Sequence, residues 1–264
     1  MKITKNILLY HNVNQTYLKY FMDRFPEKKV NYRDLLRVVT EDENIGFARW
    51  LVGTFFNPFD ELVESNVHCK HIFFPGSVMC HGDLVAQGSV FVGAGIHIRG
   101  DLIVSGDIFA GGNIIVEGNI LSDGGGIESK MGDIFSAKNI KSLGLISSGG
   151  YTTAQLGIES HFGAIESKGS ISAKNGSINS LLMITSGDGV YSGGDIVCRG
   201  VIAATNIHAR GIIDSRGYGV FAGTRVAVGE WGQKATVMSQ VMPRDFVSGA
   251  WKLFHEQPEN GEEC

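Results

Sequence analysis

The chain has 264 residues, of which 43% are hydrophobic and 19% are charged, so it carries enough apolar side chain for a packed core. Glycine is unusually common, with 36 residues against only 5 prolines, but no Gly-X-Y triplet repeat is present, which excludes a collagen-like fibre. Lys and Arg total 23 while Asp and Glu total 27, and the resulting net charge of −4 argues against nucleic acid or an anionic membrane as a partner.

The cysteines and apolar runs bear on the compartment. Cysteine occurs four times without any CxxC pairing, which is too sparse for a disulfide framework (Cys69, Cys80, Cys198 and Cys264). The apolar run at 7–10 is too short for a signal peptide, and no run approaches the roughly 20 residues of a membrane span. We therefore expect a cytoplasmic protein in a reducing compartment, without a membrane span.

The first compositional zone, residues 1–71, is poor in glycine and predicts a small helical region. Apolar residues at three- and four-residue spacing predict a helix over 17–25. A second helix is predicted to begin after Asn31 as its N-cap, a third to run over 43–55, and a short fourth to start at residue 57. Two interpretations of the many aromatic residues remain open: they form the core of a small lid, or they form a docking module for a partner.

The middle of the chain, from 76 to 242, lacks proline, and an aliphatic residue recurs there every six positions, with occasional one-residue slips, as far as Val226. Written from Gly76, the units are GSVMCH, GDLVAQ, GSVFVG, AGIHIR, GDLIVS, GDIFAG, GNIIVE and GNILSD. The alternation inside a unit has the period of a strand, and Gly-Asp or Gly-Asn between units is typical of a turn. Three units make one coil, which predicts a mainly β fold: a triangular single-stranded β-helix of about eight coils of about 18 residues. In later units serine takes the second inward position, so its hydroxyl must bond to another serine or to a backbone carbonyl.

Both ends of the predicted solenoid, which spans 72–230, carry bulky residues. A solenoid exposes unpaired strands at its ends, and proteins cover such edges or assemble through them. We predict a helical cap over 231–255, followed by an acidic tail over 256–264. The candidate cap or assembly residues are Ile72, Phe74, Trp231, Phe246, Trp251 and Phe254.

Units such as GDIFAGGNIIVEGNI and GGDIVCRGVIAATNI give the middle zone a resemblance to a known family. Over about 76–228 the repeat resembles the bactofilins, which are polymer-forming cytoskeletal proteins of bacteria. The resemblance implies a right-handed β-helix and assembly into homopolymers through the terminal coils. Bactofilins flank their helix with short tails, whereas this chain carries apparent structured caps at both ends, so the two differ where such polymers would join.

The phrase Ile-His-x-Arg-Gly occurs twice and places a His and an Arg side by side on the outer face of a strand. The candidate binding face comprises His97, Arg99, Arg199, His208, Arg210 and Arg216. These residues form either a site for an anion or carbohydrate or a solvated outer surface. No catalytic residue is assigned, because no carboxylate or nucleophile falls at a fixed offset from them.

Two further kinds of chemistry, acyl transfer and zinc binding, have candidate residues in the sequence. A left-handed hexapeptide-repeat acyltransferase would use His97, His161 or His208 as its base, but the order of aliphatic and small residues differs from that family's repeat. A dense group of possible zinc ligands has spacings that fit no zinc motif, so no metal or cofactor is expected (His68, Cys69, His71, Cys80 and His81). The favoured prediction is a non-enzymatic structural or scaffold protein that binds itself or another protein. A carbohydrate-binding or carbohydrate-active β-helix is the alternative.

Overall fold

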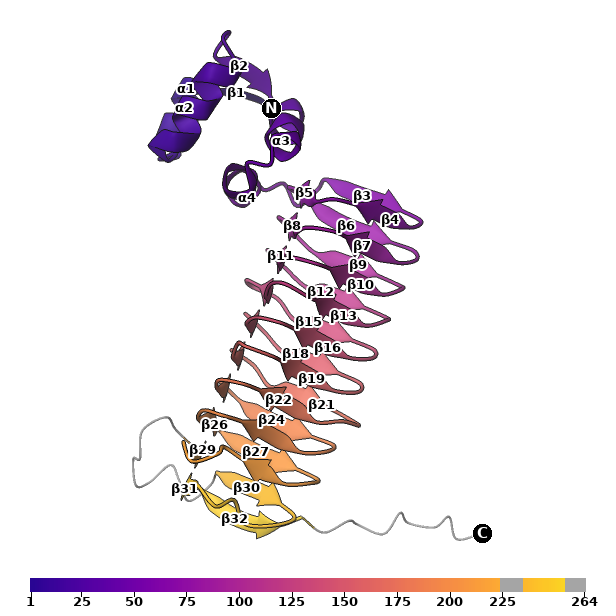
Figure 1. Ribbon diagram of the computed structural model, residues 1–264, viewed down its shortest axis with the longest axis vertical. Coiled ribbons are helices and arrows are strands. Elements are labelled where there is room, and N and C mark those ends of the chain that lie inside the picture. Colours follow the sequence, from indigo (N-terminus) through magenta and orange to yellow (C-terminus); the bar gives the residue numbers. More distant parts are fainter. Residues whose placement is uncertain (224–234, 255–264) are drawn as a thin grey trace.

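The computed structural model describes residues 1–223 and 235–254 and shows an elongated parallel β-solenoid with a small helical region at its N-terminal end (Figure 1). This confirms the predicted fold class and the repeat of about 18 residues per coil. No helix in the described part of the chain is long and apolar enough to cross a membrane.

The helical region holds the four helices of the described residues and one short antiparallel strand pair. The helices are α1 (Lys5–Tyr10), α2 (Gln15–Arg24), α3 (Tyr32–Glu41) and α4 (Ile45–Thr54), and the paired strands are β1 (Lys2–Thr4) and β2 (Lys29–Asn31). The predicted N-cap is confirmed, since Asn31 Oδ1 accepts a hydrogen bond from the Arg33 amide at 3.1 Å. Aromatic and aliphatic side chains of all four helices share one buried core.

The helix predicted to start at residue 57 is wrong. The Asn57 amide donates instead to the Pro75 carbonyl, and the Ser77 amide donates to the Asp60 carbonyl. These bonds place the segment 57–60 in the first coil of the solenoid. Its Asn57 amide and Asp60 carbonyl therefore bond to the next coil rather than within a helix. Helix α1 and the β1–β2 pair were not predicted, because each is too short to show a clear periodicity.

Three parallel sheets form the solenoid, and each takes every third strand as far as β30, after which β31 joins sheet III and β32 joins sheet I. Sheet I contains β3 (Glu61–Glu64), β6 (Ser77–Cys80), β9 (Ile96–Ile98), β12 (Ile114–Val116), β15 (Ile134–Ser136), β18 (Thr152–Ala154), β21 (Ile171–Ala173), β24 (Gly189–Ser192), β27 (Asn206–Ala209), β30 (Thr236–Ser239) and β32 (Ala250–Leu253). Sheet II contains β4 (Val67–Cys69), β7 (Leu84–Ala86), β10 (Leu102–Val104), β13 (Ile120–Ser122), β16 (Ile140–Ser142), β19 (Ile158–Ser160), β22 (Ile178–Ser180), β25 (Ile196–Cys198) and β28 (Ile213–Asp214). Sheet III contains β5 (Ile72–Phe74), β8 (Val90–Val92), β11 (Ile108–Ala110), β14 (Ile127–Ser129), β17 (Ile146–Ser148), β20 (Ile165–Ser167), β23 (Ile184–Ser186), β26 (Ile202–Ala204), β29 (Val220–Ala222) and β31 (Phe246–Ser248).

Stacked aliphatic residues fill the interior, as the six-residue period predicts. Ile140, for example, is fully buried and pairs in register with Ile120 on one side and Ile158 on the other. The inward serines also follow the prediction. Ser136 Oγ donates to the Gly118 carbonyl at 2.7 Å, while Ser148 and Ser167 join hydroxyl to hydroxyl at 2.8 Å. Each of these hydroxyls therefore has a hydrogen-bond partner within an otherwise apolar interior.

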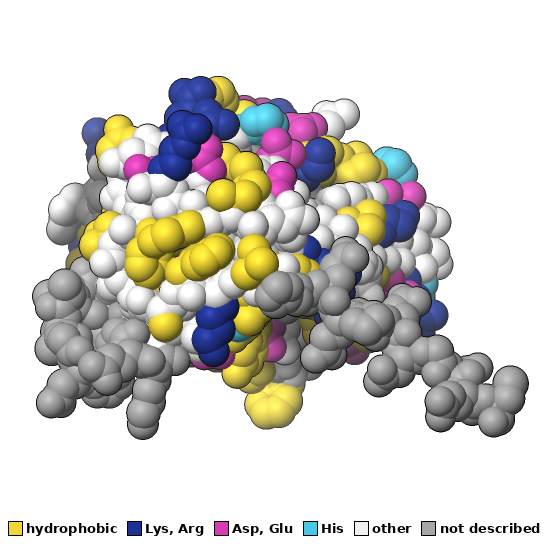
Figure 2. All heavy atoms as spheres, turned by 90° about the horizontal axis from the view of Figure 1, so that it is seen from below, with side chains coloured by type: hydrophobic (Ala, Val, Ile, Leu, Met, Phe, Trp, Pro, Cys, Tyr) yellow, Lys and Arg dark blue, Asp and Glu magenta, His cyan; other side chains and the backbone are white. Residues whose placement is uncertain are grey.

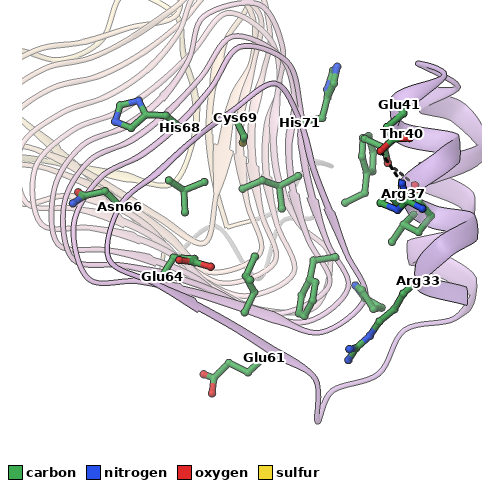
Figure 3. Close-up of a pocket in the computed structure, with 17 residues that line it drawn as sticks. Arg33, Arg37, Thr40, Glu41, Glu61, Glu64, Asn66, His68, Cys69 and His71 are labelled. Carbon is green, nitrogen blue, oxygen red and sulfur yellow. Dashed lines mark hydrogen bonds and ion pairs between the residues drawn. The ribbon is translucent and has the colours of Figure 1, made fainter.

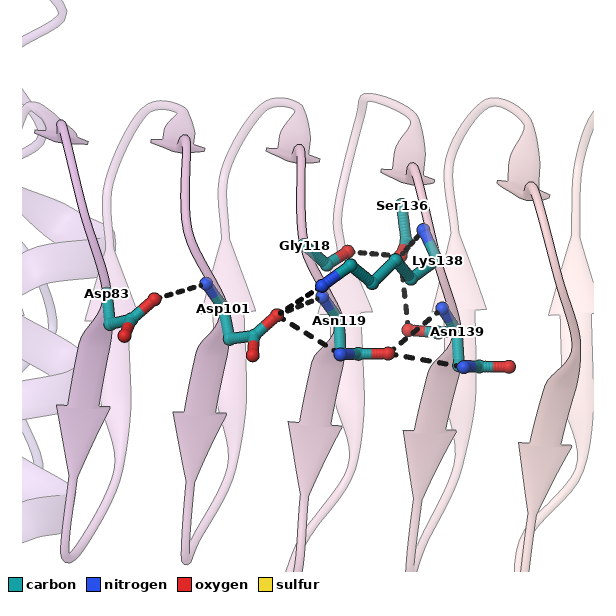
Figure 4. A network of polar contacts seen from close by, with 7 residues as sticks. All are labelled: Asp83, Asp101, Gly118, Asn119, Ser136, Lys138 and Asn139. Carbon is teal, nitrogen blue, oxygen red and sulfur yellow. Dashed lines mark hydrogen bonds and ion pairs between the residues drawn. The ribbon is translucent and has the colours of Figure 1, made fainter.

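Side-chain ladders link the turns of successive coils. Asp83 Oδ1 accepts from the Asp101 amide at 2.8 Å, and Asp101 Oδ1 accepts from the Asn119 amide at 2.7 Å (Figure 4). Asn119 Oδ1 in turn accepts from the Asn139 amide at 3.3 Å. The Lys138 ammonium lies 3.9 Å from the Asp101 carboxylate. Short polar side chains recur at these turns because each satisfies an amide one coil further on.

The solenoid differs from the prediction at both ends. It has about ten coils rather than about eight, because β3 and β4 complete a first coil that begins before residue 72 and further strands follow residue 235. The predicted C-terminal helix is wrong in the described residues, where Phe246–Ser248 and Ala250–Leu253 are the strands β31 and β32. Gly249, with φ of +104°, breaks any helix there, and the open edges of β29 and β30 supply hydrogen-bond partners for added strands. The candidate residue Trp231 and the tail over 256–264 lie outside the described residues.

A ladder of three phenylalanines fixes the helical region to the outside of sheet III. Phe73, Phe91 and Phe109 point outward on β5, β8 and β11, with ring centroids 5.5 and 5.7 Å apart. Helix α4 packs against β5 and β8, and its Arg49 guanidinium lies 4.7 Å from the centre of the Phe91 ring and 4.0 Å from Glu128. The helical region is thus a clamp that α4 fixes to the outer face of sheet III, while α1, α2 and α3 extend past the first coil to one side of it (Figure 1).

Candidate functional site

The structure separates the residues of the predicted binding face. His97 and His208 both point outward from sheet I, but they lie on β9 and β27, six strands apart. At about 4.8 Å per strand this separation is about 29 Å. Arg199 and Arg216 line a shallow groove of about 220 Å³ on sheet II, beside Glu159 and His161. His208 and Arg210 line another of about 170 Å³, beside Tyr191. The predicted face is therefore not one site: Arg199 and Arg216 line one groove, His208 and Arg210 line a second, and His97 and Arg99 lie apart from both.

His208 has a structural role in its groove. Its Nε2 lies 2.7 Å from the Thr236 hydroxyl, which joins β27 to β30, and its ring makes an edge contact with Tyr191 at 5.4 Å. Burial, and secondarily the charge of Lys252, lowers the pKa of His208 below its usual value. The imidazole is thus held neutral near pH 7 with its partner already in place.

A larger cleft lies elsewhere, between α3 and the first coil, with a volume of about 720 Å³. Figure 3 shows it at the N-terminal end of the solenoid, with α3 standing beside the coil. One wall is the helix, with Arg33, Arg37 and Leu36, and the other is the open interior of the coil. That interior is lined by apolar side chains at inward positions of β3, β4 and β5: Leu62, Val67, Cys69, Ile72 and Phe74.

The first coil has hydrogen-bonded neighbours on one side only. Strands β3, β4 and β5 each end their sheet in the described structure. The Val67 amide donates to Asp83 and the Cys69 carbonyl accepts from Gln87, so the inward residues of β4 bond to the second coil. Because backbone groups alternate in direction along a strand, the amide and carbonyl of His68 face the open end. On β5 the outward residue is Phe73, so its amide and carbonyl face the open end in the same way.

The charges around the cleft are mostly solvent-exposed. Arg33 lies 3.6 Å from Asp60, and Arg37 lies 3.2 Å from Glu41, with side chains 76% and 63% exposed. Glu64 is exposed at an inward position of β3, where later coils carry Cys80 and Ile98. An inward charge on an edge strand discourages indiscriminate pairing, since an added strand would have to bury it.

Two contacts tie the cleft to the helical region and to the second coil. The Lys70 ammonium pairs with Glu43, which leads into α4, and this pairing lowers the pKa of the Glu43 carboxyl. His71 Nδ1 accepts from the Ser89 amide at 3.0 Å. Burial lowers the pKa of His71, with Lys70 acting in the same direction, so the acceptor form is favoured near pH 7.

The candidate assembly residues fall at the two ends of the solenoid. Ile72 is buried and Phe74 half-buried, both in the register that the repeat predicts. At the other end, Phe246 and Trp251 pack against the end of the core, and Trp251 Nε1 donates to Ser239 Oγ at 3.2 Å. Hydrophobic side chains gather near the middle of this C-terminal face (Figure 2). Phe254 instead lines the groove beside His208.

Sequence reasoning missed α3 as a wall of the cleft and β3 and β4 as its floor. The segment 61–69 lacks the glycines of the repeat, and its inward Glu64 breaks the aliphatic pattern. A backward extension of the register through Leu62 and Val67 was the available signal. Among the described residues no group of three or more His, Cys, Asp or Glu side chains could hold a metal ion.

Cysteine alkylation should show how open this end is. We expect iodoacetamide to modify Cys69 before Cys198 in a Cys264→Ser background, because Cys69 is half-buried and Cys198 fully buried. Burial raises both pKa values, that of Cys198 to about 11, so both labelling rates should rise between pH 7 and 9 as thiolate forms. Mass spectrometry of timed samples measures this, and faster labelling of Cys198 than of Cys69 would contradict the open first coil.

Comparison with protein-family models, curated proteins and solved structures found no match to this chain.

Proposed function

We propose that the chain is a non-enzymatic cytoplasmic scaffold, similar to the bactofilins, that acts through self-assembly or through binding a protein partner at the ends of its solenoid. The observation that carries the proposal is that the terminal strands of all three sheets have a neighbour on one side only, at both ends of the described solenoid. Edge strands are templates for pairing with another chain. At the N-terminal end the half-buried Leu62, Val67 and Phe74 add apolar surface to that template.

The helical clamp supports this use of the end. Because it docks on the outer face of sheet III through Phe73 and Phe91, it leaves the interior of the first coil open along the axis. A clamp in this position also strengthens the terminal coil, which would otherwise be the most easily frayed part of a repeat protein. A carbohydrate-binding groove has less support, since the two His–Arg pairs lie far apart on sheet I.

Light scattering after size exclusion, with negative-stain electron microscopy across protein concentration and salt, tests the proposal. We expect mass that rises with concentration, and filaments or short stacks in the images. His68→Pro should reduce this assembly, because it removes an amide that faces the open end while the Val67 and Cys69 bonds to the second coil remain. Phe74→Asp should do the same by placing a charge in the apolar end.

His68→Ala is the matched control and should assemble like the parent chain, with circular dichroism confirming that all variants fold. A monomer at every concentration would exclude self-assembly and leave binding of another protein, which pull-downs with the parent chain and His68→Pro would then test.

A further inference from the structure

Resting on the proposed function, we propose that the cleft between α3 and the first coil binds an extended peptide of a partner protein, which adds as a parallel strand to β5 and carries the side-chain order aliphatic, acidic, aliphatic. The contacts that define this order come from three features of the cleft: a free strand edge, an apolar interior and a helix wall that carries two exposed arginines.

The strand edge fixes the backbone pairing. Within the solenoid the outward residue of each sheet III strand faces the preceding coil, while the inward residues face the next: the Ile72 amide donates to Ser89, and the Phe74 carbonyl accepts from Gly93. The amide and carbonyl of Phe73 therefore face the cleft. A parallel strand added there would offer its first carbonyl and its third amide to Phe73.

The interior fixes the first and third side chains of the peptide. In the register that β5 shares with β8, these residues lie opposite Ile72 and Phe74 and point into the solenoid. There they meet Leu62 and Val67, which are only half-buried in the free chain. Aliphatic side chains at these two positions would continue the interior column by one more layer, and burial of their apolar surface favours binding.

The helix wall fixes the central side chain. It lies opposite Phe73 and points outward, toward the side on which α3 stands. Figure 3 shows both arginines on this wall, with Arg33 reaching toward the coil and Arg37 lying beside Glu41. Their present partners, Asp60 and Glu41, are solvent-accessible and weakly held. Both guanidinium groups can therefore turn to a carboxylate between them.

The other two terminal strands fit such a peptide less well. A strand added to β3 would have to bury Glu64 at an inward position. A strand added to β4 finds no helix wall, because α3 stands beside β5. Of the three terminal strands, the cleft therefore favours β5, with the peptide running parallel to it.

The test uses a fluorescein-labelled peptide, Gly-Asp-Ile-Glu-Val-Ser-Gly, with blocked ends, and fluorescence anisotropy against the full chain. We expect saturable binding. A peptide with Lys in place of Glu should bind at least about tenfold more weakly through loss of the charged contact. A peptide with N-methylvaline in place of Val should weaken similarly, because it lacks the amide that Phe73 would accept while its side chain is unchanged. Bound peptide should also slow alkylation of Cys69 and leave Cys198 unaffected.

Charge reversal separates recognition from misfolding. The double variant Arg33→Glu, Arg37→Glu should prefer the Lys peptide over the Glu peptide, an inversion that a damaged fold would not produce. Arg210→Glu, on a distant groove, should keep the parent preference. Absence of binding by the parent chain, equal binding of the N-methylated peptide, or an unchanged preference in the double variant would each overturn the proposal. Light scattering without peptide reports assembly independently, so failure of this peptide site and failure of the scaffold proposal are distinguishable.

Discussion

Ile140→Ala should destabilise the solenoid by about 2–5 kcal/mol, the usual range for truncating a fully buried aliphatic side chain. Ile140 is fully buried on β16 and stacks on Ile120 and Ile158, so its removal leaves a void in the middle of the column. Urea denaturation followed by circular dichroism measures the loss of unfolding free energy.

The control for this variant is its chain neighbour. Lys141→Ala changes the outward residue of the same strand, which is exposed and pairs with Glu159 at 3.3 Å across the neighbouring coil. An exposed ion pair contributes less than about 1 kcal/mol, so this variant should unfold close to the parent chain. Equal effects of the two substitutions would contradict the assignment of inward and outward faces.

Phe91→Ala should release the helical clamp from the solenoid. Phe91 is 2% exposed and contacts aromatic neighbours on both sides along the ladder, with Arg49 against its ring. Truncating a buried Phe costs about 3–5 kcal/mol, which is comparable to the whole stability of a small docked module. Hydrogen exchange should therefore accelerate in α4 and along the exposed edge of β5, while the coils after residue 130 keep their protection.

Phe135→Ala provides the comparison for Phe91. Phe135 also points outward, from β15 on sheet I, but it is only half-buried and is not part of the helical core. Its removal should leave exchange in α4 unchanged. If Phe91→Ala left hydrogen exchange in α4 as slow as in the parent chain, the clamp would have to be held by contacts other than the phenylalanine ladder.

The repeat could be predicted well because one interaction dominates it. Each inward position has the same chemistry every six residues, so Ile108, Ile114 and Ile120 reveal strands, turns and coil length together. The ends could not be predicted in the same way. Trp251 and Phe246 have spacings that suit a helix, yet the free edges of β29 and β30 supply strand partners that no local pattern records.

The candidate site was harder still, because it depends on a tertiary contact. The outward phenylalanines at 73, 91 and 109 follow the repeat, but their 18-residue spacing shows only that they share a face. That α4 covers this face, and that α3 consequently stands beside β5, follows from the packing of the helical region. The His–Arg phrases, by contrast, are local patterns, and they proved to lie six strands apart on sheet I, with His208 and Arg210 beside a small groove.

The phenylalanine ladder also gives the solenoid a polarity. In a stack of coils, stability is the sum of each coil's own contribution and its contacts with its neighbours. The clamp packs on the coils of β5, β8 and β11 and reaches β14 through the exposed Arg49–Glu128 ion pair. Unravelling should therefore start at the C-terminal coils and travel toward the clamp, so that the N-terminal end holds its shape under conditions that loosen the other.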